Sequence, residues 1–396
     1  AGNGDHQGSG RAGGDGVMKK LLPEVCTIQY GFPFDSAKFS DSNGMPLIRI
    51  RDVVRGYSET YTTEEYKSEY IVHENDLLIG MDGEFNIAKW GKTPALLNQR
   101  VCRLAPNDSI DKDYLFYFMP IALKRIEEKT PFVTVKHLSA KELNKIEIPI
   151  LPLEEQRKIA ETLSKVDELI AFRDRQLAKL DELVKARFVE MFGNPIENTM
   201  NWPKKLLRDI TTKIGSGATP KGGRESYPNA GVSLIRSMNV YDGQFLYKDL
   251  AHLTDEQATQ LNGVTVEAED VLVNITGASV ARSCVVPKDV LPARVNQHVA
   301  IVRCNRELLN PIFTNKMFIN NEFKKALLSI GESGGATRQA ITKKQLEELS
   351  VVVPPLSIQN EFFTFSECVD QQKQTVQQSL DKLELMKKAL MQEYFG

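Results

Sequence analysis

Two stretches of the chain carry apolar residues at alternating spacings of four and three positions. The seam of the first stretch is Ile159, Leu163, Val166, Ile170, Arg173, Leu177, Leu180, Val184, Arg187 and Met191. The seam of the second is Phe362, Ser366, Val369, Lys373, Val376, Leu380, Leu383, Lys387, Leu390 and Tyr394. Because a period of 3.5 residues sustained over about five heptads is typical of a coiled coil, both stretches are predicted to be long helices. At roughly 38 residues, each helix would be about 55–60 Å long.

The two stretches are also copies of one another. At a fixed offset of 203, Pro152–Gly193 matches Pro355–Gly396 at 13 of 42 positions without a gap. Proline at the start and glycine just past the end are ordinary helix punctuation. Since the two seams have matching lengths, we expect their apolar residues to pair the helices as an antiparallel coiled coil. The alternative is two independent surface helices, each packed on its own domain.

Shorter matches extend the repeat to the rest of the chain. Leu47-Ile48-Arg49 resembles Leu234-Ile235-Arg236, and the motifs Asn-Asp-Leu-Leu and Asn-Gln-x-Val each have a counterpart in the second half. Each half mixes short Val/Ile-rich strands, Gly/Pro/Asn turns and one short helix (about 111–128 and 309–329), which predicts an α+β domain. The expected organisation is a leader at 1–17, domains at 18–151 and 194–354, and long helices at 152–193 and 355–396.

Composition narrows the class of protein. Hydrophobic residues make up 41% and charged residues 26%, and no apolar run reaches the 18 residues that a membrane span needs. The five scattered cysteines, without a C-x-x-C pair, favour a reducing cytosol over disulfides or a zinc site. Residues 1–17 are expected to be an expression scar or flexible leader. Their G-x-G-x-x-G match has no strand before it and no helix after it, so no dinucleotide site is predicted.

The repeated motifs identify a family by resemblance. The run Pro-Leu-x-Glu-Gln-x-x-Ile-Ala at 152–160, the heptad helix ending in Met-Phe-Gly, and the Asn-Gln-x-Val and Asp-x-Leu motifs resemble the specificity (S) subunit of type I restriction–modification systems. The resemblance covers essentially the whole chain from Met18. It implies a cytoplasmic, membrane-free subunit with two target-recognition domains for double-stranded DNA and two helices that dock two modification (methyltransferase) subunits. It also implies restriction (translocase/endonuclease) subunits in a larger complex.

The same resemblance implies that this chain has no catalysis and binds no cofactor, while S-adenosylmethionine, ATP and Mg belong to partner subunits. The motifs agree, since the sequence contains no P-loop, no Asn/Asp-Pro-Pro-aromatic tetrad, no G-x-S-x-G and no histidine pair at metal-ligand spacing. Two other interpretations stay open. One is a chain of this type with its own methyltransferase or nuclease activity. The other is a structural coiled-coil protein whose domains bind protein or glycan.

DNA contacts are expected where basic and polar residues gather in loops. The net charge is only −2, but 203–248 carries eight Lys/Arg against three Asp/Glu, and the Gly-rich run 214–224 lets backbone approach a ligand closely. Side chains of these types can donate to phosphates or to base edges. The predicted DNA-binding residues are Lys38, Arg49, Arg100, Lys136, His137, Gly215, Ser216, Thr219, Lys221, Arg224, Arg236, Arg294, Thr337, Arg338 and Gln339.

The predicted mechanism is positional. Each domain would contact about 3–4 bp, and the paired helices would set the distance between the two half-sites. If both domains face one side of the duplex, the half-sites lie roughly 10 bp apart, which leaves about 6–7 bp unread. The target is therefore expected to be bipartite and asymmetric.

Overall fold

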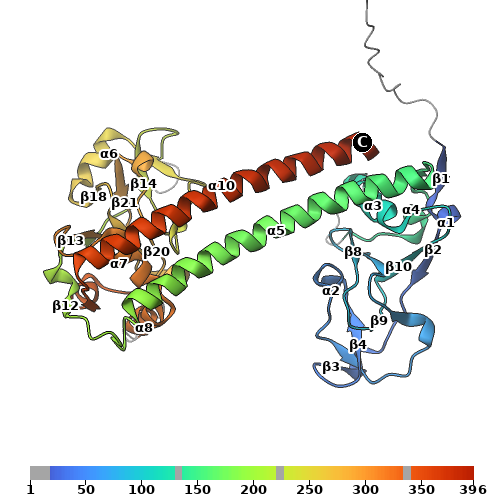
Figure 1. Cartoon of the computed structure of the whole chain (residues 1–396), viewed down its shortest axis with the longest axis horizontal. Helices are drawn as coiled ribbons and strands as arrows, with labels where there is room; N and C mark the ends of the chain where they lie inside the picture. Colours follow the sequence, from blue (N-terminus) through green and yellow to red (C-terminus); the bar gives the residue numbers. More distant parts are fainter. Residues whose placement is uncertain (1–17, 130–135, 220–226, 333–339) are drawn as a thin grey trace, which may run out of the picture. The chain divides into compact units, whose positions relative to one another are not determined.

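The computed structural model describes residues 18–129, 136–219, 227–332 and 340–396. The chain forms two compact units. The first runs up to Arg173 and includes Ser379–Gly396, and the second is Asp174–Gln378. Each unit therefore combines one strand-rich domain with a segment of both long helices (Figure 1).

The described residues of the first domain form three sheets. A two-stranded sheet joins β1 to β11, a four-stranded antiparallel sheet has the order β2-β10-β7-β8, and a five-stranded sheet has the order β3-β5-β4-β9-β6. The strands are β1 Lys19–Leu21, β2 Cys26–Tyr30, β3 Phe39–Ser40, β4 Met45–Ile48, β5 Tyr61–Thr62, β6 Ile71–Val72, β7 Leu77–Gly80, β8 Asn86–Lys89, β9 Ala95–Leu97, β10 Val101–Pro106 and β11 Glu147–Pro149. The helices are α1 Leu22–Val25, α2 Ile50–Arg55, α3 Lys112–Lys129 and α4 Ala140–Leu143.

The second domain repeats this plan. It has a two-stranded sheet β12-β23, four-stranded sheets β13-β22-β19-β20 and β17-β14-β21-β18, and a small hairpin β15-β16. The strands are β12 Lys204–Leu206, β13 Thr211–Ser216, β14 Val232–Ile235, β15 Val240–Tyr241, β16 Gln244–Phe245, β17 Ala251–Leu253, β18 Thr265–Val266, β19 Val271–Asn274, β20 Ser283–Val285, β21 Ala293–Val295, β22 Val299–Cys304 and β23 Ser350–Val352. The helices are α6 Asp255–Gln260, α7 Pro311–Phe318, α8 Asn321–Glu332 and α9 Lys343–Glu347.

The ladders confirm the repeat seen in the sequence. The Leu-Ile pairs of the two Leu-Ile-Arg motifs end β4 and β14, and each of these strands pairs in parallel with one other strand, β9 or β21. One expected helix is different in detail. The sequence suggested a single helix over about 309–329, whereas the chain breaks between α7 and α8, because Asn320 accepts the first amides of α8 with its side-chain oxygen.

Both long helices begin and end where the punctuation predicts. Helix α5 is Leu153–Phe192 and α10 is Leu356–Phe395, each 40 residues long and each preceded by proline. Glu154 and Glu155 lie in the first turn of α5, where their negative charges interact favourably with the positive end of the helix dipole. Gly193 ends α5 with a positive φ of 71°, and its amide donates to the carbonyl of Val189 at 2.8 Å.

Helices α5 and α10 pack together in an antiparallel sense within each unit. In the first unit, Lys387 Nζ lies 2.6 Å from Asp167 Oδ1, and Arg173 Nε donates to Ser379 Oγ at 3.2 Å. In the second unit, Lys373 contacts Asp181 at 2.5 Å and Arg187 contacts Glu361 at 3.1 Å. Partner numbers on α10 fall as those on α5 rise, which confirms the predicted antiparallel pair (Figure 1).

Burial follows the predicted seam along both helices. Leu163, Val166 and Val184 of α5 are buried, as are Val369, Val376 and Leu380 of α10. Ile159, Ile170, Leu177, Leu180, Leu383 and Leu390 are half-buried. Part of this burial comes from the domains, since Ile159, Leu163 and Leu390 belong to the core of the first domain and Leu180, Val184 and Val369 to that of the second. The predicted pairing is therefore confirmed, and the seam residues near the helix ends also pack on the domains.

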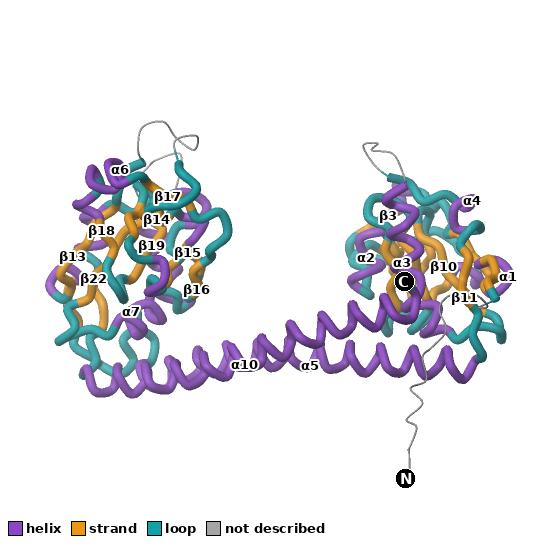
Figure 2. Tube along the Cα trace, turned by 90° about the horizontal axis from the view of Figure 1, so that it is seen from above, coloured by secondary structure: helices purple, strands orange, loops and turns teal. Residues whose placement is uncertain are grey.

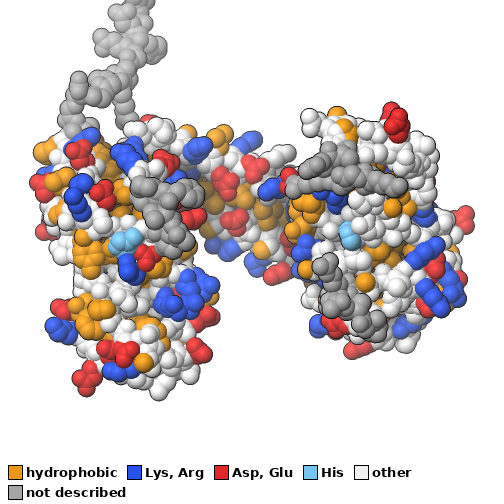
Figure 3. Space-filling view, turned by 180° about the vertical axis from the view of Figure 1, so that it is seen from behind, with side chains coloured by type: hydrophobic (Ala, Val, Ile, Leu, Met, Phe, Trp, Pro, Cys, Tyr) orange, Lys and Arg blue, Asp and Glu red, His pale blue; other side chains and the backbone are white. Residues whose placement is uncertain are grey.

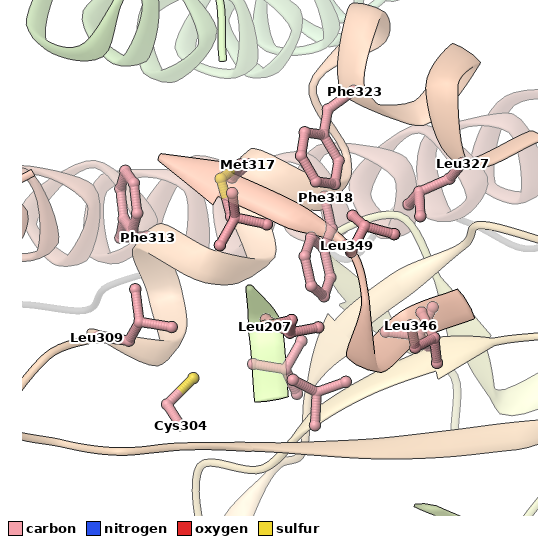
Figure 4. Packing of buried hydrophobic residues seen from close by; sticks show 14 of the residues in the cluster. Leu207, Cys304, Leu309, Phe313, Met317, Phe318, Phe323, Leu327, Leu346 and Leu349 are labelled. Atoms are coloured by element: carbon pink, nitrogen blue, oxygen red, sulfur yellow. The ribbon is translucent and has the colours of Figure 1, made fainter. Parts of the chain in front are cut away.

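Aromatic residues at the helix ends complete the two domain cores. Phe395 of α10 lies 5.2 Å from the ring of Tyr114 on α3 in the first unit. Phe192 of α5 lies 4.7 Å from Phe313 on α7 in the second unit, and α7 separates the strands from the helix pair in Figure 2. Figure 4 shows how the α7 and α8 side chains continue this core toward Leu346 and Leu349. Burying a side chain as large as phenylalanine contributes about 1.5–3 kcal/mol, so each helix end is a substantial part of its domain.

A repeated buried glutamine explains the Pro-Leu-x-x-Gln motif. Gln156 and Gln359 are both fully buried one turn inside their helices. Gln156 Oε1 accepts the amide of Asp111 at 2.8 Å and its Nε2 donates to the carbonyl of Leu151 at 2.7 Å. Gln359 makes equivalent bonds in the second unit, to the amide of Asn310, to the carbonyl of Pro354 before its own helix and to the carbonyl of Leu308 before α7. The glutamine therefore fastens the start of each long helix to the short helix of its domain.

Candidate nucleic-acid interface

Three loops meet at one end of the four-stranded sheet in the first domain. They are the β7–β8 loop, the turn between β9 and β10, and the segment from Lys136 to Leu138. The amide of Leu138 donates to the carbonyl of Met81 at 2.7 Å, and the amide of Met81 donates to the carbonyl of Arg100 at 2.9 Å. Asp82 and His137 form an isolated antiparallel bridge. Backbone bonds therefore hold residues from three distant parts of the sequence in one cluster.

The side chains on these loops form a polar cluster of Asp82, Arg100 and His137. Asp82 Oδ1 lies 2.5 Å from His137 Nδ1 and 3.7 Å from Arg100 Nη1, and Arg100 Nη1 is 3.1 Å from the same ring nitrogen. The side chains of Arg100 and His137 are about half exposed, at 52% and 46%, whereas Asp82 is 22% exposed. The cluster thus presents a cation and an imidazole outward from a partly sheltered carboxylate.

The equivalent loops of the second domain form a different polar cluster. Ile341 donates to the carbonyl of Ile275 at 2.8 Å, as Leu138 does to Met81, and a bridge joins Thr276 to Ala340. Here the Asn-Gln motif supplies Gln297 and His298. His298 Nδ1 lies 2.5 Å from Thr276 Oγ1, while the hydroxyl of Thr219 hydrogen-bonds to Gln297 Oε1. The two domains therefore share the backbone hydrogen bonds of these loops but carry different exposed side chains on them.

In each domain, a glycine just after a strand lets the backbone lie directly against the Asn-Gln turn. These glycines are Gly31 after β2 and Gly217 after β13. A Cβ on Gly31 would lie 2.0 Å from the carbonyl oxygen of Asn98, and one on Gly217 would lie 1.7 Å from that of Val295. No larger residue fits at this separation. The exposed side chains on either side of the two glycines differ between the domains. They are Tyr30 and Phe32 in the first domain and Ser216 and Thr219 in the second.

Ser216 and Gly215 also line a polar pocket beside the edge strand β13. Its volume is about 590 Å³, and its walls include Lys213, Arg208 and Lys343. The two basic residues Arg208 and Lys343 each have a carboxylate neighbour, Asp209 at 3.7 Å and Glu347 at 3.4 Å. The pocket lies at the end of β13 that carries Ser216, and the loop cluster begins three residues later at Thr219. Three of the predicted residues, Gly215, Ser216 and Thr219, therefore lie close together.

Other predicted residues lie elsewhere. Lys38 is exposed at the end of a short turn that begins at Ser36. Arg49 precedes α2 and Arg236 precedes the matching turn of the second domain, and the amide of each donates to an acceptor three residues later, at 2.9 and 3.0 Å. The side chain of Lys136 turns toward α3, where Nζ donates to the Glu127 carbonyl at 2.9 Å. Their role in DNA contact stays a prediction.

Arg294 lies inside its domain. It is 9% exposed, and its guanidinium donates to the carbonyls of Ala258 and Ala293 and, at 2.8 Å, to Asn262 Oδ1. Desolvation lowers the pKa of Arg294 from its usual value. This environment favours a structural role over the predicted contact with DNA. The remaining predictions, at Lys221, Arg224, Thr337, Arg338 and Gln339, fall outside the described residues.

The sequence-based candidates omitted four members of the clusters, Asp82, Thr276, Gln297 and His298. Gln297 lies in the Asn-Gln motif itself, and Asp82 stands next to Gly83 in the turn that follows the Asp-x-Leu motif. The aspartates of that motif serve the fold, since Asp76 pairs with Arg103 at 3.0 Å and Asp270 with Arg303 at 2.8 Å. Proximity to a repeated motif was therefore the available signal for the missed residues.

The surface charge is mixed. On the face shown in Figure 3, Lys and Arg side chains alternate with Asp and Glu. Within the described ranges, no group of three or more His, Cys, Asp or Glu side chains is arranged to hold a metal ion. None of the helices in these ranges has the length and apolar character needed to cross a lipid bilayer.

Comparison with known proteins gives the family. The Type I restriction modification DNA specificity domain matches this chain twice, at residues 14–182 and 200–385. The chain is 29% identical over 398 residues to the type I restriction enzyme EcoBI specificity subunit of Escherichia coli. The aligned region covers 90% of this chain and 81% of that protein.

Two solved structures share the fold. The S subunit of the type I restriction–modification system from M. genitalium superposes with a TM-score of 0.59 at 15% identity, over 96% of each chain. A chain from a structure of the complex assembly and conformational transition of the type I R-M system gives a TM-score of 0.57 at 17% identity, over 96% of this chain and 97% of that one. With two family domains that together span most of its length, the chain belongs to the type I restriction–modification DNA specificity family.

Proposed function

We propose that this chain is the sequence-specific DNA-recognition subunit of a type I restriction–modification complex. Each domain would contact one half of a bipartite, asymmetric target in double-stranded DNA. The observation that supports this most directly is the contrast between repeated backbone and changed chemistry at the loop clusters. A fold used twice with Asp82, Arg100 and His137 on one copy and Thr276, Gln297 and His298 on the other is suited to two different base sequences.

The chain is proposed to act without catalysis of its own. Relatives are named specificity subunits of restriction enzymes, which supports a division of labour among chains. Two modification subunits would dock on α5 and α10, and restriction subunits would join the larger complex in the cytoplasm. S-adenosylmethionine, ATP and Mg would bind to those partners. Because the surface charge is mixed, the partners would also supply much of the phosphate attraction that is independent of sequence.

The test is methylation mapping. A host that expresses this chain with the modification subunit of its own system is sequenced by a long-read method that detects methylated bases. A bipartite methylated motif that is lost when this chain is deleted would support the proposal. A methylated motif with one continuous core, or a motif that is unchanged without this chain, would overturn it.

The antiparallel helix pair is proposed to set the distance between the half-sites. Since Asp167 meets Lys387 and Asp181 meets Lys373, positions whose numbers add up to 554 lie at the same level of the pair. A heptad inserted near 174 in α5 and another near 380 in α10 keeps both seams in phase. Seven residues lengthen a helix by about 10 Å, which is about three base pairs of 3.4 Å. The unread gap should grow by about 3 bp, with both half-sites unchanged.

A further inference from the structure

We propose that Arg100 contacts a guanine in one half-site, and that Asp82 and His137 position it. This inference rests on the proposed function and assigns one base contact within it. Arg100 would act directly on the DNA, whereas the other two residues would act through Arg100. Three features of the cluster support this assignment: the backbone conformation of Arg100, the proton on His137 Nδ1 and the open edge of the guanidinium.

The backbone of Arg100 is in an unusual conformation. Its φ is +70°, in the left-handed region that side chains other than Asn and Asp rarely adopt. The amide of Met81 donates to the Arg100 carbonyl at 2.9 Å, and the amide of Val101 donates to the carbonyl of Asn98 at 3.2 Å, so the turn is held on both sides. Strained positions that the surrounding structure holds in place are concentrated at functional sites.

The contact between Asp82 and His137 defines which ring nitrogen carries the proton. A carboxylate only accepts hydrogen bonds, and two lone pairs 2.5 Å apart would repel strongly. His137 Nδ1 must therefore donate to Asp82 Oδ1. It cannot at the same time accept from Arg100 Nη1, although that atom is 3.1 Å away. The remaining attraction on Arg100 is the ion pair with Asp82 at 3.7 Å, so one carboxylate orients both neighbours.

The opposite edge of the Arg100 guanidinium is left open. Nη1 faces Asp82 and His137, while Nε and Nη2 have no partner among the described residues, and the side chain is about half exposed. Two parallel N–H donors on one edge match O6 and N7 of guanine in the major groove. A phosphate is a poorer ligand here, because the Asp82 carboxylate beside the guanidinium would repel it. The geometry therefore favours a neutral base edge.

The second domain supports a role in specificity. The repeat aligns Asn98-Gln99-Arg100 with Asn296-Gln297-His298, so the position of Arg100 is a histidine there. His298 bonds to Thr276 and approaches the side chain of Gln297, and no carboxylate is part of that cluster among the described residues. A residue needed only for folding would be expected in both copies, as Gln156 and Gln359 are.

The test uses the complex of this chain with the modification subunits of its own system. Methylation mapping first gives the target, and competition binding then compares the target duplex with duplexes in which each base pair is replaced. For the unaltered chain, replacing one G·C pair in one half-site should weaken binding about 10- to 100-fold. Arg100→Gln should reduce that factor to about 1 while the preferences in the other half-site remain. Arg125→Gln, which removes an exposed charge from α3, should leave all preferences unchanged.

The positioning residues have a separate readout. Asp82→Asn should reduce discrimination at the same base pair without weakening binding to DNA of unrelated sequence, since it removes a negative charge. His137→Asn keeps an N–H donor for Asp82 and should preserve more discrimination than His137→Ala. A role only in folding would instead lower all affinities together.

The outcomes separate the two levels of the argument. If the unaltered chain confers no bipartite motif, the proposed function fails and the inference falls with it. If the motif is present and Arg100→Gln retains every base preference, the inference alone is overturned. If Arg100→Gln abolishes binding altogether, Arg100→Lys, which keeps the charge, decides the question. Lost discrimination at one G·C pair supports the contact, and full discrimination overturns it.

Discussion

Replacing Gln156 with leucine should weaken the first unit specifically. The side chain is fully buried, accepts the Asp111 amide at 2.8 Å and donates to the Leu151 carbonyl at 2.7 Å. Leucine has a similar size but leaves both backbone groups without their partner. Each of the two unsatisfied buried groups costs about 1–3 kcal/mol, and the added apolar burial returns about 1 kcal/mol, so we expect a net loss of about 1–5 kcal/mol.

Hydrogen exchange measured by mass spectrometry can localise this loss. In Gln156→Leu, peptides that contain the Asp111 amide and the first turns of α5 should exchange faster, while peptides of the second domain stay protected. Gln359→Leu should give the mirror result around Asn310. Gln378→Leu makes the same change at an exposed position of α10 and should alter the free energy of unfolding by less than about 0.5 kcal/mol. Unchanged exchange at Asp111 in Gln156→Leu would refute the reasoning.

Three further outcomes follow from burial. Arg294→Leu leaves the carbonyl of Ala258 and the Asn262 side chain without their donor, so thermal melts should show a loss of about 1–3 kcal/mol. Phe395→Ala removes a ring packed on Tyr114 and should cost about 3–5 kcal/mol in urea unfolding, although only one residue follows it in this chain. Burial raises the thiol pKa to about 11 for Cys304 and about 12 for three other cysteines, so at pH 8 a thiol reagent should label Cys368 in the native protein and all five thiols in urea. The three thiols with a pKa raised to about 12 are those of Cys26, Cys102 and Cys284.

The raised thiol pKa values also set the direction of a pH effect. In the unfolded chain these thiols lose their protons near pH 8.5–9, whereas the native protein keeps them to about pH 11. Above pH 9 the unfolded state therefore binds fewer protons than the native state. The free energy of unfolding should fall as the pH rises from 9 to 11, and less so after the buried cysteines are replaced by alanine or serine.

Most of the fold could be predicted from the periodicity of the apolar residues and from the internal repeat. Proline, glycine and the 3.5-residue seam gave both long helices to within one or two residues, because these signals are local. The shorter motif matches between the two halves predicted two copies of one domain, and the parallel pairs β4–β9 and β14–β21 confirm them. The break between α7 and α8 was missed, because it depends on the Asn320 side chain accepting the amides of Glu322 and Phe323, and no periodic pattern shows that choice.

Candidate site residues were harder to predict, because charge does not show where a side chain points. Arg100 and Arg294 look alike in sequence, yet one is half exposed and the other lies among carbonyls of its own domain. Asp82 was missed because an acidic residue argues against DNA on charge alone. Its place in the cluster follows from Leu138 pairing with Met81, a contact between segments more than fifty residues apart.

The same contrast suggests how one scaffold can serve two sequences. Residues that repeat in both halves, such as Gln156 with Gln359 and the aspartates Asp76 and Asp270, are buried or paired inside the domains. The loops at the sheet end keep their backbone bonds, because Leu138 and Ile341 pair in the same way, but their exposed side chains differ. If the loop clusters contact the bases as proposed, stability and base contact depend on separate residues. Substitution at positions such as Arg100 could alter one half-site without disturbing the glutamine, aspartate and seam contacts that hold the scaffold together.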